Sequence, residues 1–395
     1  MEGNLVVAHG GGPTAVINSS LYGVITEAKK YPSIKGIYAA RYGIEGVLSE
    51  NFVDLARESD KNIELLPHTP SSAIGSCRRK LTEDDYIKLV EVFKKYNIRY
   101  FFYNGGNDSM DTCNKVANLS KQAGYEMRVI GIPKTIDNDL ACTDHCPGFG
   151  SAARFIAINA MDLAREVQAL PAHVLILETM GRNAGWLAAS AVFAKRNEES
   201  CPQLIYLPEI PFNEEKFLED VNQWNKRTKG LLVVVSEGLA DEKGEMIANL
   251  GTTDGFGHKT PGGVAQVLAD SIMKNLKIKA RAEKPGLVGR ASYITQSRID
   301  REEAIGVGRF AVKSAIEGKT GYMVSINRTS NTPYQSDFSL VELDKVANFE
   351  RKFPLEWINE EGNGIKKEFI DYGLPLLGDP LPEYAAFDYY GVPKV

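Results

Sequence analysis

The sequence has few cysteines, and their arrangement excludes one class of protein. Its 395 residues include five, an odd number scattered along the chain: Cys77, Cys113, Cys142, Cys146 and Cys201. This usage does not suit a secreted domain held by disulfides and is typical of a reducing cytoplasm, so we expect a cytoplasmic protein. Cys142 and Cys146 flank His145, but zinc sites usually pair two such clusters, and the sequence contains no second one.

Other absences exclude further classes. No stretch reaches 18 uninterrupted apolar residues, so the sequence predicts no transmembrane helix, and we expect no membrane partner. The first residues have no basic segment ahead of an apolar run, so the sequence predicts no signal peptide. With 46 basic and 51 acidic side chains the net charge is −5, which argues against a dedicated nucleic-acid binder. Repeats of 20–50 residues and low-complexity tracts are also missing.

Short apolar runs recur along the chain, and most are followed by a glycine-containing turn and an amphipathic stretch. Such alternation is typical of parallel strands joined by right-handed helical crossovers. We therefore predict an α/β fold with two lobes of mostly parallel sheet, flanked by helices, and an active site in the cleft. The strands are expected at 5–8, 100–103, 129–132, 174–177 and 231–235. The helices are expected at 15–29, 82–96, 108–123, 262–276, 301–317 and from about 186 to 196.

Two glycine-rich loops follow predicted strands. The segment His9–Thr14 (HGGGPT) offers bare backbone N–H groups at a helix start, which suits phosphate, although such a turn is often only a tight corner. It is not a Walker A loop, because no GK[ST] follows, and the GxGxxG spacing of dinucleotide sites is missing. The second loop, Asn104–Ser109 (NGGNDS), adds the carboxylate of Asp108.

The densest polar cluster is Pro133–Asp139 (PKTIDND), directly after another predicted strand. Asn–Asp clusters often only shape turns. However, the carboxylates of Asp137 and Asp139 beside Lys134 suit phosphoryl transfer, because one can accept a hydroxyl proton while the other holds Mg²⁺. Arg182, which follows the next strand, is a candidate for stabilising charge on a transferring phosphoryl group.

These motifs together resemble one family. GGGPT, GGNDS, PKTIDND, ETMGR and SEG, in this order, resemble the phosphofructokinase family from about Leu5 to Lys319. The resemblance implies that Asp137 deprotonates the C1 hydroxyl of fructose 6-phosphate and that Arg182 lies over the transferring phosphoryl group. It also implies roles for the neighbours of these two residues. Thr135 lies beside the base, Asp139 binds metal, Met180 and Gly181 line the sugar, Glu237 holds sugar hydroxyls, and Gly11 and Arg78 contact donor phosphates.

Two positions bear on the phosphoryl donor. ATP-using relatives have glycine where this sequence has Asp108 and Lys134, and the pair resembles the pyrophosphate-dependent branch. An aspartate repels the place where a nucleotide's α-phosphate would lie, and a lysine supplies charge to a small anionic donor. The resemblance thus implies reversible, Mg²⁺-dependent transfer from pyrophosphate to fructose 6-phosphate. Residues 1–140, completed by later segments, would bind the donor, residues 141–330 the sugar phosphate, and residues 331–395 would pack on both lobes.

Several positions depart from the family pattern. Asn107 stands where many relatives have a metal-binding aspartate, so the expected metal set is Asn107, Asp108 and Asp139. In the best register Arg290 is the 6-phosphate arginine and Leu287 replaces the usual histidine. Three more positions belong to this comparison: Arg281 at an interface-arginine position, Arg298 as the rival of Arg290, and His173 where a neighbouring subunit usually supplies an arginine.

Alternatives stay open at this point. The chain could be an ATP-dependent kinase of the same fold, or a non-catalytic regulatory subunit, although the latter would be expected to lack Asp137. Sedoheptulose 7-phosphate could replace fructose 6-phosphate, because Leu287 and Gly289 depart from the pattern. The expected partners are small-molecule substrates and further copies of the chain, in a homodimer or homotetramer. Phe256 and His258 are expected to be structural or to form a rim of the sugar site.

Overall fold

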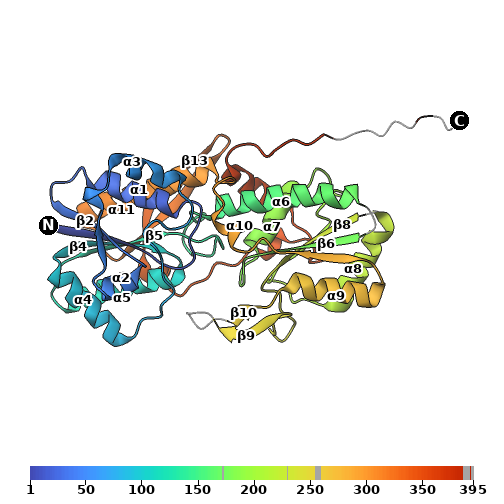
Figure 1. The fold of residues 1–395 in the computed structure, drawn as a ribbon, viewed down its shortest axis with the longest axis horizontal. Helices are drawn as coiled ribbons and strands as arrows, with labels where there is room; N and C mark the ends of the chain where they lie inside the picture. Colours follow the sequence, from blue (N-terminus) through green and yellow to red (C-terminus); the bar gives the residue numbers. More distant parts are fainter. Residues whose placement is uncertain (171–172, 229, 254–258, 386–391, 393–395) are drawn as a thin grey trace.

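A computed structural model describes residues 1–170, 173–228, 230–253, 259–385 and 392. Phe256 and His258, and most of the last ten residues of the expected C-terminal extension, lie outside these ranges. The described chain forms two lobes side by side, each built on its own sheet (Figure 1). No helix in these ranges is long and apolar enough to cross a membrane.

The first lobe contains a sheet with the strand order β13-β12-β5-β4-β1-β2-β3. Its inner strands pair in parallel, whereas β3 and β13 pair antiparallel at the two edges. Runs such as Leu5–Ala8 are fully buried, as expected for parallel strands covered on both faces. The strands are β1 (Gly3–His9), β2 (Ile34–Ala40), β3 (Phe52–Asp54), β4 (Ile98–Gly105), β5 (Arg128–Pro133), β12 (Tyr322–Asn331) and β13 (Tyr334–Glu342).

Helices cover both faces of this sheet (Figure 1). One face packs on α1 (Ile17–Ala28) and α11 (Arg298–Ile316), and the other on α2 (Ile44–Leu48), α4 (Glu83–Lys95) and α5 (Asn107–Gln122). The short α3 (Asp60–Leu65), η1 (Leu55–Arg57) and η2 (Leu66–His68) lie in the connection after β3. Thr82 and Asp85 form a reciprocal capping box at the start of α4, as their spacing predicts.

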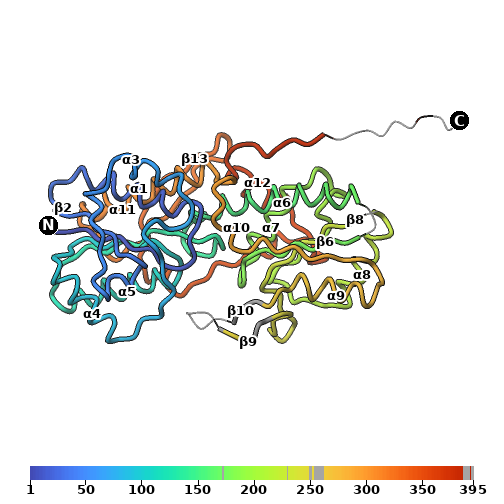
Figure 2. Tube along the Cα trace, viewed as in Figure 1, coloured from blue at the N-terminus to red at the C-terminus, as the bar shows by residue number. Residues whose placement is uncertain are grey.

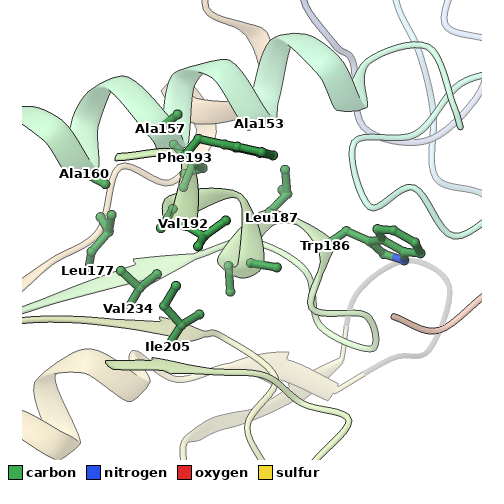
Figure 3. Packing of buried hydrophobic residues seen from close by; sticks show 14 of the residues in the cluster. Ala153, Ala157, Ala160, Leu177, Trp186, Leu187, Val192, Phe193, Ile205 and Val234 are labelled. Carbon is green, nitrogen blue, oxygen red and sulfur yellow. The ribbon is translucent and has the colours of Figure 1, made fainter. Parts of the chain in front are cut away.

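The second lobe contains a parallel sheet with the order β11-β6-β8-β7. One face packs on α6 (Phe149–Ala169), α7 (Trp186–Ala189) and η3 (Ser190–Ala194), as Figure 3 shows, and the other on α8 (Glu214–Arg227) and α9 (Val264–Leu276). A separate hairpin, β9 (Asn249–Thr253) and β10 (Lys259–Pro261), and α10 (Leu287–Ala291) complete this part of the chain. The strands are β6 (His173–Thr179), β7 (Leu204–Tyr206), β8 (Gly230–Ser236) and β11 (Ala280–Glu283).

The later segments divide between the lobes differently from the expected boundaries. Helix α11 and the hairpin β12–β13 belong to the first lobe, although the sequence placed a lobe boundary at residue 330, which lies inside β12. The reason is packing, because Val307 and Val312 of α11 join the core of the first sheet. After η4 (Leu343–Lys345) the chain crosses to the second lobe, where η5 (Leu355–Trp357), α12 (Lys367–Gly373) and η6 (Leu374–Leu377) pack on its core.

Candidate active site

The carboxyl ends of neighbouring parallel strands bring the predicted motifs together. In the first lobe, His9 of β1 pairs with Asn104 of β4, and Gly105 pairs with Pro133 of β5. The three loops that follow these strands therefore meet at one edge of the sheet, where open α/β sheets bind ligands. In the second lobe, Thr179 of β6 pairs with Ser236 of β8, which brings the loops bearing Arg182 and Glu237 together in the same way.

Short hydrogen bonds fix the first glycine loop against the segment that carries Arg78. The Gly11 N–H donates to the Cys77 carbonyl (2.9 Å), and the Ser76 hydroxyl donates to the Gly11 carbonyl (2.7 Å). Gly11 has a φ of +74°, a left-handed conformation that glycine adopts without strain. The loop and Arg78 thus form one unit, as the resemblance implies for a donor-phosphate site.

Three cations converge on this loop. The Lys134 ammonium donates to the carbonyls of Gly10 (2.7 Å) and Gly12 (2.8 Å). A methyl group at Gly12 would lie 2.9 Å from Nη1 of Arg290 and 3.3 Å from Nη2 of Arg78, so both guanidinium groups lie close against this glycine. Burial, and then the charges of Arg290 and Arg78, lower the pKa of Lys134 to about 7. A cluster of this kind favours a small, highly charged anion, whose binding would raise that pKa again.

Asp137 lies beside this cluster in a half-buried position. Burial, and then the charges of Asp139 and Glu237, raise the pKa of Asp137 to about 7, and the charge of Arg182 opposes the rise. Its backbone N–H donates to the Thr135 hydroxyl (3.1 Å). A carboxyl group with a pKa near neutrality can both take up and release a proton, which a general base requires.

Asp137 also lies close to the second lobe. A methyl group at Gly181 (φ +116°) would lie 4.0 Å from Oδ1 of Asp137. The Ser236 hydroxyl donates to the Gly181 carbonyl (2.5 Å), which ties this loop to the end of β8. Gly238 has to be glycine, because a methyl group there would overlap the Arg182 carbonyl oxygen at 1.6 Å. These close approaches hold the MGR and SEG motifs together opposite the base.

Asn107 and Asp139 form a second polar group at the site. The Asn107 amide donates to Oδ2 of Asp139 (3.3 Å). The other oxygens of the two side chains, Oδ1 of Asn107 and Oδ1 of Asp139, are buried and have no hydrogen-bond partner among the residues that the structure describes. Burial, and then the charge of Glu350, raise the pKa of Asp139. Asp108 follows at the first turn of α5 and is exposed.

The second lobe supplies two residues that the sequence interpretation did not single out. Lys284 lies 2.5 Å from Oε1 of the buried Glu178, whose Oε2 accepts from the Ala265 N–H (2.9 Å). Burial raises the pKa of Glu237, and the charge of Lys284 opposes the rise. Lys284 resembles an ordinary surface lysine in the sequence, and only the pairing of β11 with β6 brings it to the site.

The remaining expected residues differ in where they lie. Arg290, the expected 6-phosphate arginine, lies against Gly12 and Arg78 of the donor loop. Its rival Arg298 is exposed at the surface and pairs with Glu302 and Asp379. Arg281 is exposed on β11, whereas His173 is buried at the start of β6. Met180 lines a small cavity with Ile136 and Gly289, and Leu287 is exposed on α10.

Comparison with known proteins decides the family. The family model described as phosphofructokinase matches residues 4–315. The chain belongs to the phosphofructokinase family. The predicted family and fold class are thus confirmed, and the matched residues include every motif on which the resemblance rested.

Individual relatives match most or all of the chain. The pyrophosphate–fructose 6-phosphate 1-phosphotransferase of Xanthomonas campestris is 43% identical over 402 residues, covering 100% of this chain and 95% of that protein. A sulfofructose kinase of Alkalicoccus urumqiensis is 33% identical over 359 residues, covering 90% and 92%. The crystal structure of a pyrophosphate-dependent phosphofructokinase from Marinobacter aquaeolei superimposes with a TM-score of 0.88 at 40% identity, covering 100% of this chain and 95% of that one.

Proposed function

We propose that this chain transfers a phosphoryl group reversibly from pyrophosphate to C1 of fructose 6-phosphate, giving fructose 1,6-bisphosphate and phosphate. The observation that carries the proposal is the cluster of Lys134, Arg78 and Arg290 around Gly10–Gly12, next to the half-buried carboxyl group of Asp137. Pyrophosphate has no adenosine to anchor it, so it must be bound mainly through charge. The three cations of the cluster supply that charge for a compact anion. The names of the full-length relatives support the same reaction.

The residues around the transfer point have complementary tasks. Asp137, in its ionised form, takes the proton of the sugar O1 as that oxygen attacks the nearer phosphorus of pyrophosphate in line. Arg182 and Lys134 stabilise the charge that spreads over the transferring oxygens, and the N–H groups of the glycine loop hold the leaving phosphate. In the second lobe Glu237 and Lys284 are available to the sugar, while Met180 and Gly181 line it.

Arg290 acts on the donor phosphates in this proposal rather than on the 6-phosphate. The reason is its position, because its guanidinium group lies with Arg78 at Gly12, on the first lobe's side of the site. It extends there from α10, so bound pyrophosphate would also hold the two lobes together.

Mg²⁺ fits the residues at the strand ends. Oδ1 of Asn107 and Oδ1 of Asp139 are buried oxygens without a hydrogen-bond partner in the described part of the chain, and oxygen is the ligand atom that Mg²⁺ prefers. Among the described residues no group of three or more His, Cys, Asp or Glu side chains could hold a metal by itself. The ion would therefore be held by Asn107, Asp139 and the exposed Asp108 together with substrate phosphates. When bound, it would neutralise phosphate charge.

Two alternatives are less well supported. A non-catalytic subunit would have no use for a half-buried carboxyl group with a pKa near 7 at position 137. An ATP-dependent kinase would need room for a nucleotide past Asp108, and the sequence relatives named above include a pyrophosphate-dependent enzyme over the whole chain.

The acceptor and donor are tested with one panel. Purified wild-type enzyme is assayed with pyrophosphate or ATP against fructose 6-phosphate, sedoheptulose 7-phosphate and sulfofructose, with Mg²⁺ present. We expect the highest kcat/KM with pyrophosphate and fructose 6-phosphate. A higher kcat/KM with another sugar would show that fructose 6-phosphate is not the preferred acceptor. A higher kcat/KM with ATP would show that pyrophosphate is not the preferred donor.

The assembly and location belong to the same proposal. We expect a homodimer or homotetramer, which light scattering on the purified protein measures directly. All five cysteines, which lie in the described ranges, are free thiols, and this favours a reducing compartment such as the cytoplasm.

A further inference from the structure

The segment Glu350–Phe353 follows η4, where the chain crosses from the first lobe to the second (Figure 2). We propose that Arg351 in this segment is a positioning residue for phosphoryl transfer, which holds the loop of the base Asp137 and the loop of Arg182 in a fixed relation. The inference rests on the proposed function, and it concerns a residue outside the span 4–315 that the family model matches.

The Arg351 side chain binds the backbone of the loop that follows Asp137. Nε and Nη2 donate to the Asn138 carbonyl (3.1 and 2.8 Å), and Nη1 donates to the carbonyls of Thr143 (2.7 Å) and Asp144 (2.6 Å). The Arg351 N–H donates to the Asp139 carbonyl (2.7 Å). The planar guanidinium group of Arg351 thus binds carbonyl groups on both sides of the turn.

The loop needs such support because of its conformation. Asn138 has a φ of +54°, a left-handed conformation that residues with side chains seldom adopt, although asparagine tolerates it better than most. Its side chain is held as well, since Nδ2 donates to the Tyr372 hydroxyl (3.0 Å) and Oδ1 accepts from the Cys146 N–H (3.0 Å). Asn138 lies between Asp137 and Asp139, so a shift of its backbone would displace both carboxylates.

The same segment contacts the loop that carries Arg182. The Arg351 guanidinium carbon lies 4.7 Å from the ring centroid of Trp186, and the Trp186 indole donates to the Arg351 carbonyl (3.4 Å). The Lys352 ammonium donates to the carbonyl of Asn183 (2.6 Å). Trp186 is anchored in the core of the second lobe, so the segment fixes one catalytic loop relative to the other.

Only arginine satisfies this arrangement. Its guanidinium group is planar, which allows it to lie against the Trp186 ring while its edge donates to carbonyl groups in several directions. A lysine keeps the charge but has neither the fork nor the flat face. Because lysine keeps the charge, what Arg351→Lys loses is geometric, and this loss should affect turnover more than substrate binding, since a displacement of about 1 Å can cost about 10²-fold in rate.

The test compares Arg351→Lys and Arg351→Ala with Arg154→Lys as a matched control. Arg154 is also an arginine that binds backbone carbonyls, those of Leu377, Asp379 and Pro380, but it holds the C-terminal tail on α6. We measure kcat and both KM values with pyrophosphate and fructose 6-phosphate. We expect kcat to fall about 10–100-fold in both Arg351 variants, with KM changes below about threefold. Arg154→Lys should stay within about twofold of wild type.

Added guanidinium ion provides a second readout that a loss of stability would not give. In Arg351→Ala, millimolar guanidinium should restore part of kcat by occupying the vacated fork, and it should leave Arg154→Lys unchanged. If Arg351→Ala does not fold, Arg351→Lys alone carries the test.

Unchanged kcat in Arg351→Lys, or a loss that appears only in KM, would overturn the inference. Wild-type enzyme that is inactive with pyrophosphate would instead contradict the proposed function. The two failures are therefore distinguishable.

Discussion

At the scale of single residues, the central feature is the carboxyl group of Asp137, whose pKa lies near neutral pH. Burial and the neighbouring Asp139 keep the pKa of Asp137 at about 7, and Arg182 keeps it from rising further. The i, i+2 spacing of the two carboxylates after a strand was enough to predict this pair from the sequence. The value of the pKa was not predictable, because it depends on Glu237, which lies 100 residues further along the chain.

Replacing Asp137 by asparagine tests its role as the base. The amide keeps the size of the side chain but cannot accept the proton of O1, so kcat should fall by roughly 10²–10⁴ with little change in either KM. Steady-state kinetics with pyrophosphate and fructose 6-phosphate measure this. A variant that keeps more than about half of the wild-type kcat would remove Asp137 from the mechanism.

Replacing Asp108 by glycine tests donor selection. ATP would have to pass its α-phosphate by this carboxylate, and like-charge repulsion costs about 1 kcal/mol or more, depending on the local dielectric. Asp108→Gly should therefore gain detectable ATP-dependent activity and lose part of its activity with pyrophosphate.

Two further variants complete the donor test. Lys134→Gly alone should lose turnover with pyrophosphate, and the double variant should favour ATP further. The measurement is kcat/KM for both donors in all four forms at fixed Mg²⁺. If no form gains ATP use, the two residues do not explain donor selection.

Replacing Arg290 by alanine tests its position at the donor loop. Loss of a charge-assisted phosphate contact costs about 1.5–3 kcal/mol, and it should appear mainly in the KM of pyrophosphate. Arg298→Ala is the control, because its guanidinium group pairs with surface carboxylates. A selective rise in the KM of fructose 6-phosphate would instead support the 6-phosphate role that the sequence suggested.

At the scale of helices and strands, the sequence predicted the periodic elements well. The observed α4 begins after Thr82 and ends at Lys95, and α1 and α5 lie within about two residues of their expected bounds. The longest helix, α6, was not predicted, because Phe149–Ala169 is rich in small residues and directly follows an irregular loop. The expected helix through residue 196 is α7 followed by the 3₁₀ turn η3, which ends at Ala194.

The contact between α1 and α11 explains why α11 belongs to the first lobe. A methyl group at Gly308 would lie 2.2 Å from the Ser20 carbonyl oxygen, and one at Gly23 would lie 2.2 Å from the Ile305 carbonyl oxygen. The helices therefore approach through their glycines. The sequence shows these glycines, but only the fold shows that they face each other across about 285 positions.

Gly308→Ala tests this contact. A glycine-to-alanine change inside a helix usually stabilises it by about 1 kcal/mol. Here we expect a net loss of about 1–3 kcal/mol in the free energy of unfolding, because the added methyl group forces the helices apart. Chemical denaturation measures the change, with Lys313→Ala, an exposed position of the same helix, as control. A Gly308→Ala protein more stable than wild type would contradict the close packing.

At the scale of the whole molecule, the site exists only where two lobes and a late segment meet. The first lobe supplies the donor loop and the base, and the second supplies the arginine and the sugar side. The segment after η4 joins them. The contributions of the two lobes could be predicted, because their motifs directly follow strands. Arg351 belongs to no motif, and it contacts the site mainly through backbone carbonyl groups.

The central claim is reversible phosphoryl exchange without a nucleotide, and one measurement tests it directly. Purified wild-type enzyme is incubated with fructose 1,6-bisphosphate, phosphate and Mg²⁺ in the absence of any nucleotide, and ³¹P NMR follows the products. The account predicts that pyrophosphate and fructose 6-phosphate appear together in equal amounts. The account would be contradicted if no pyrophosphate formed while the same enzyme phosphorylated fructose 6-phosphate with ATP.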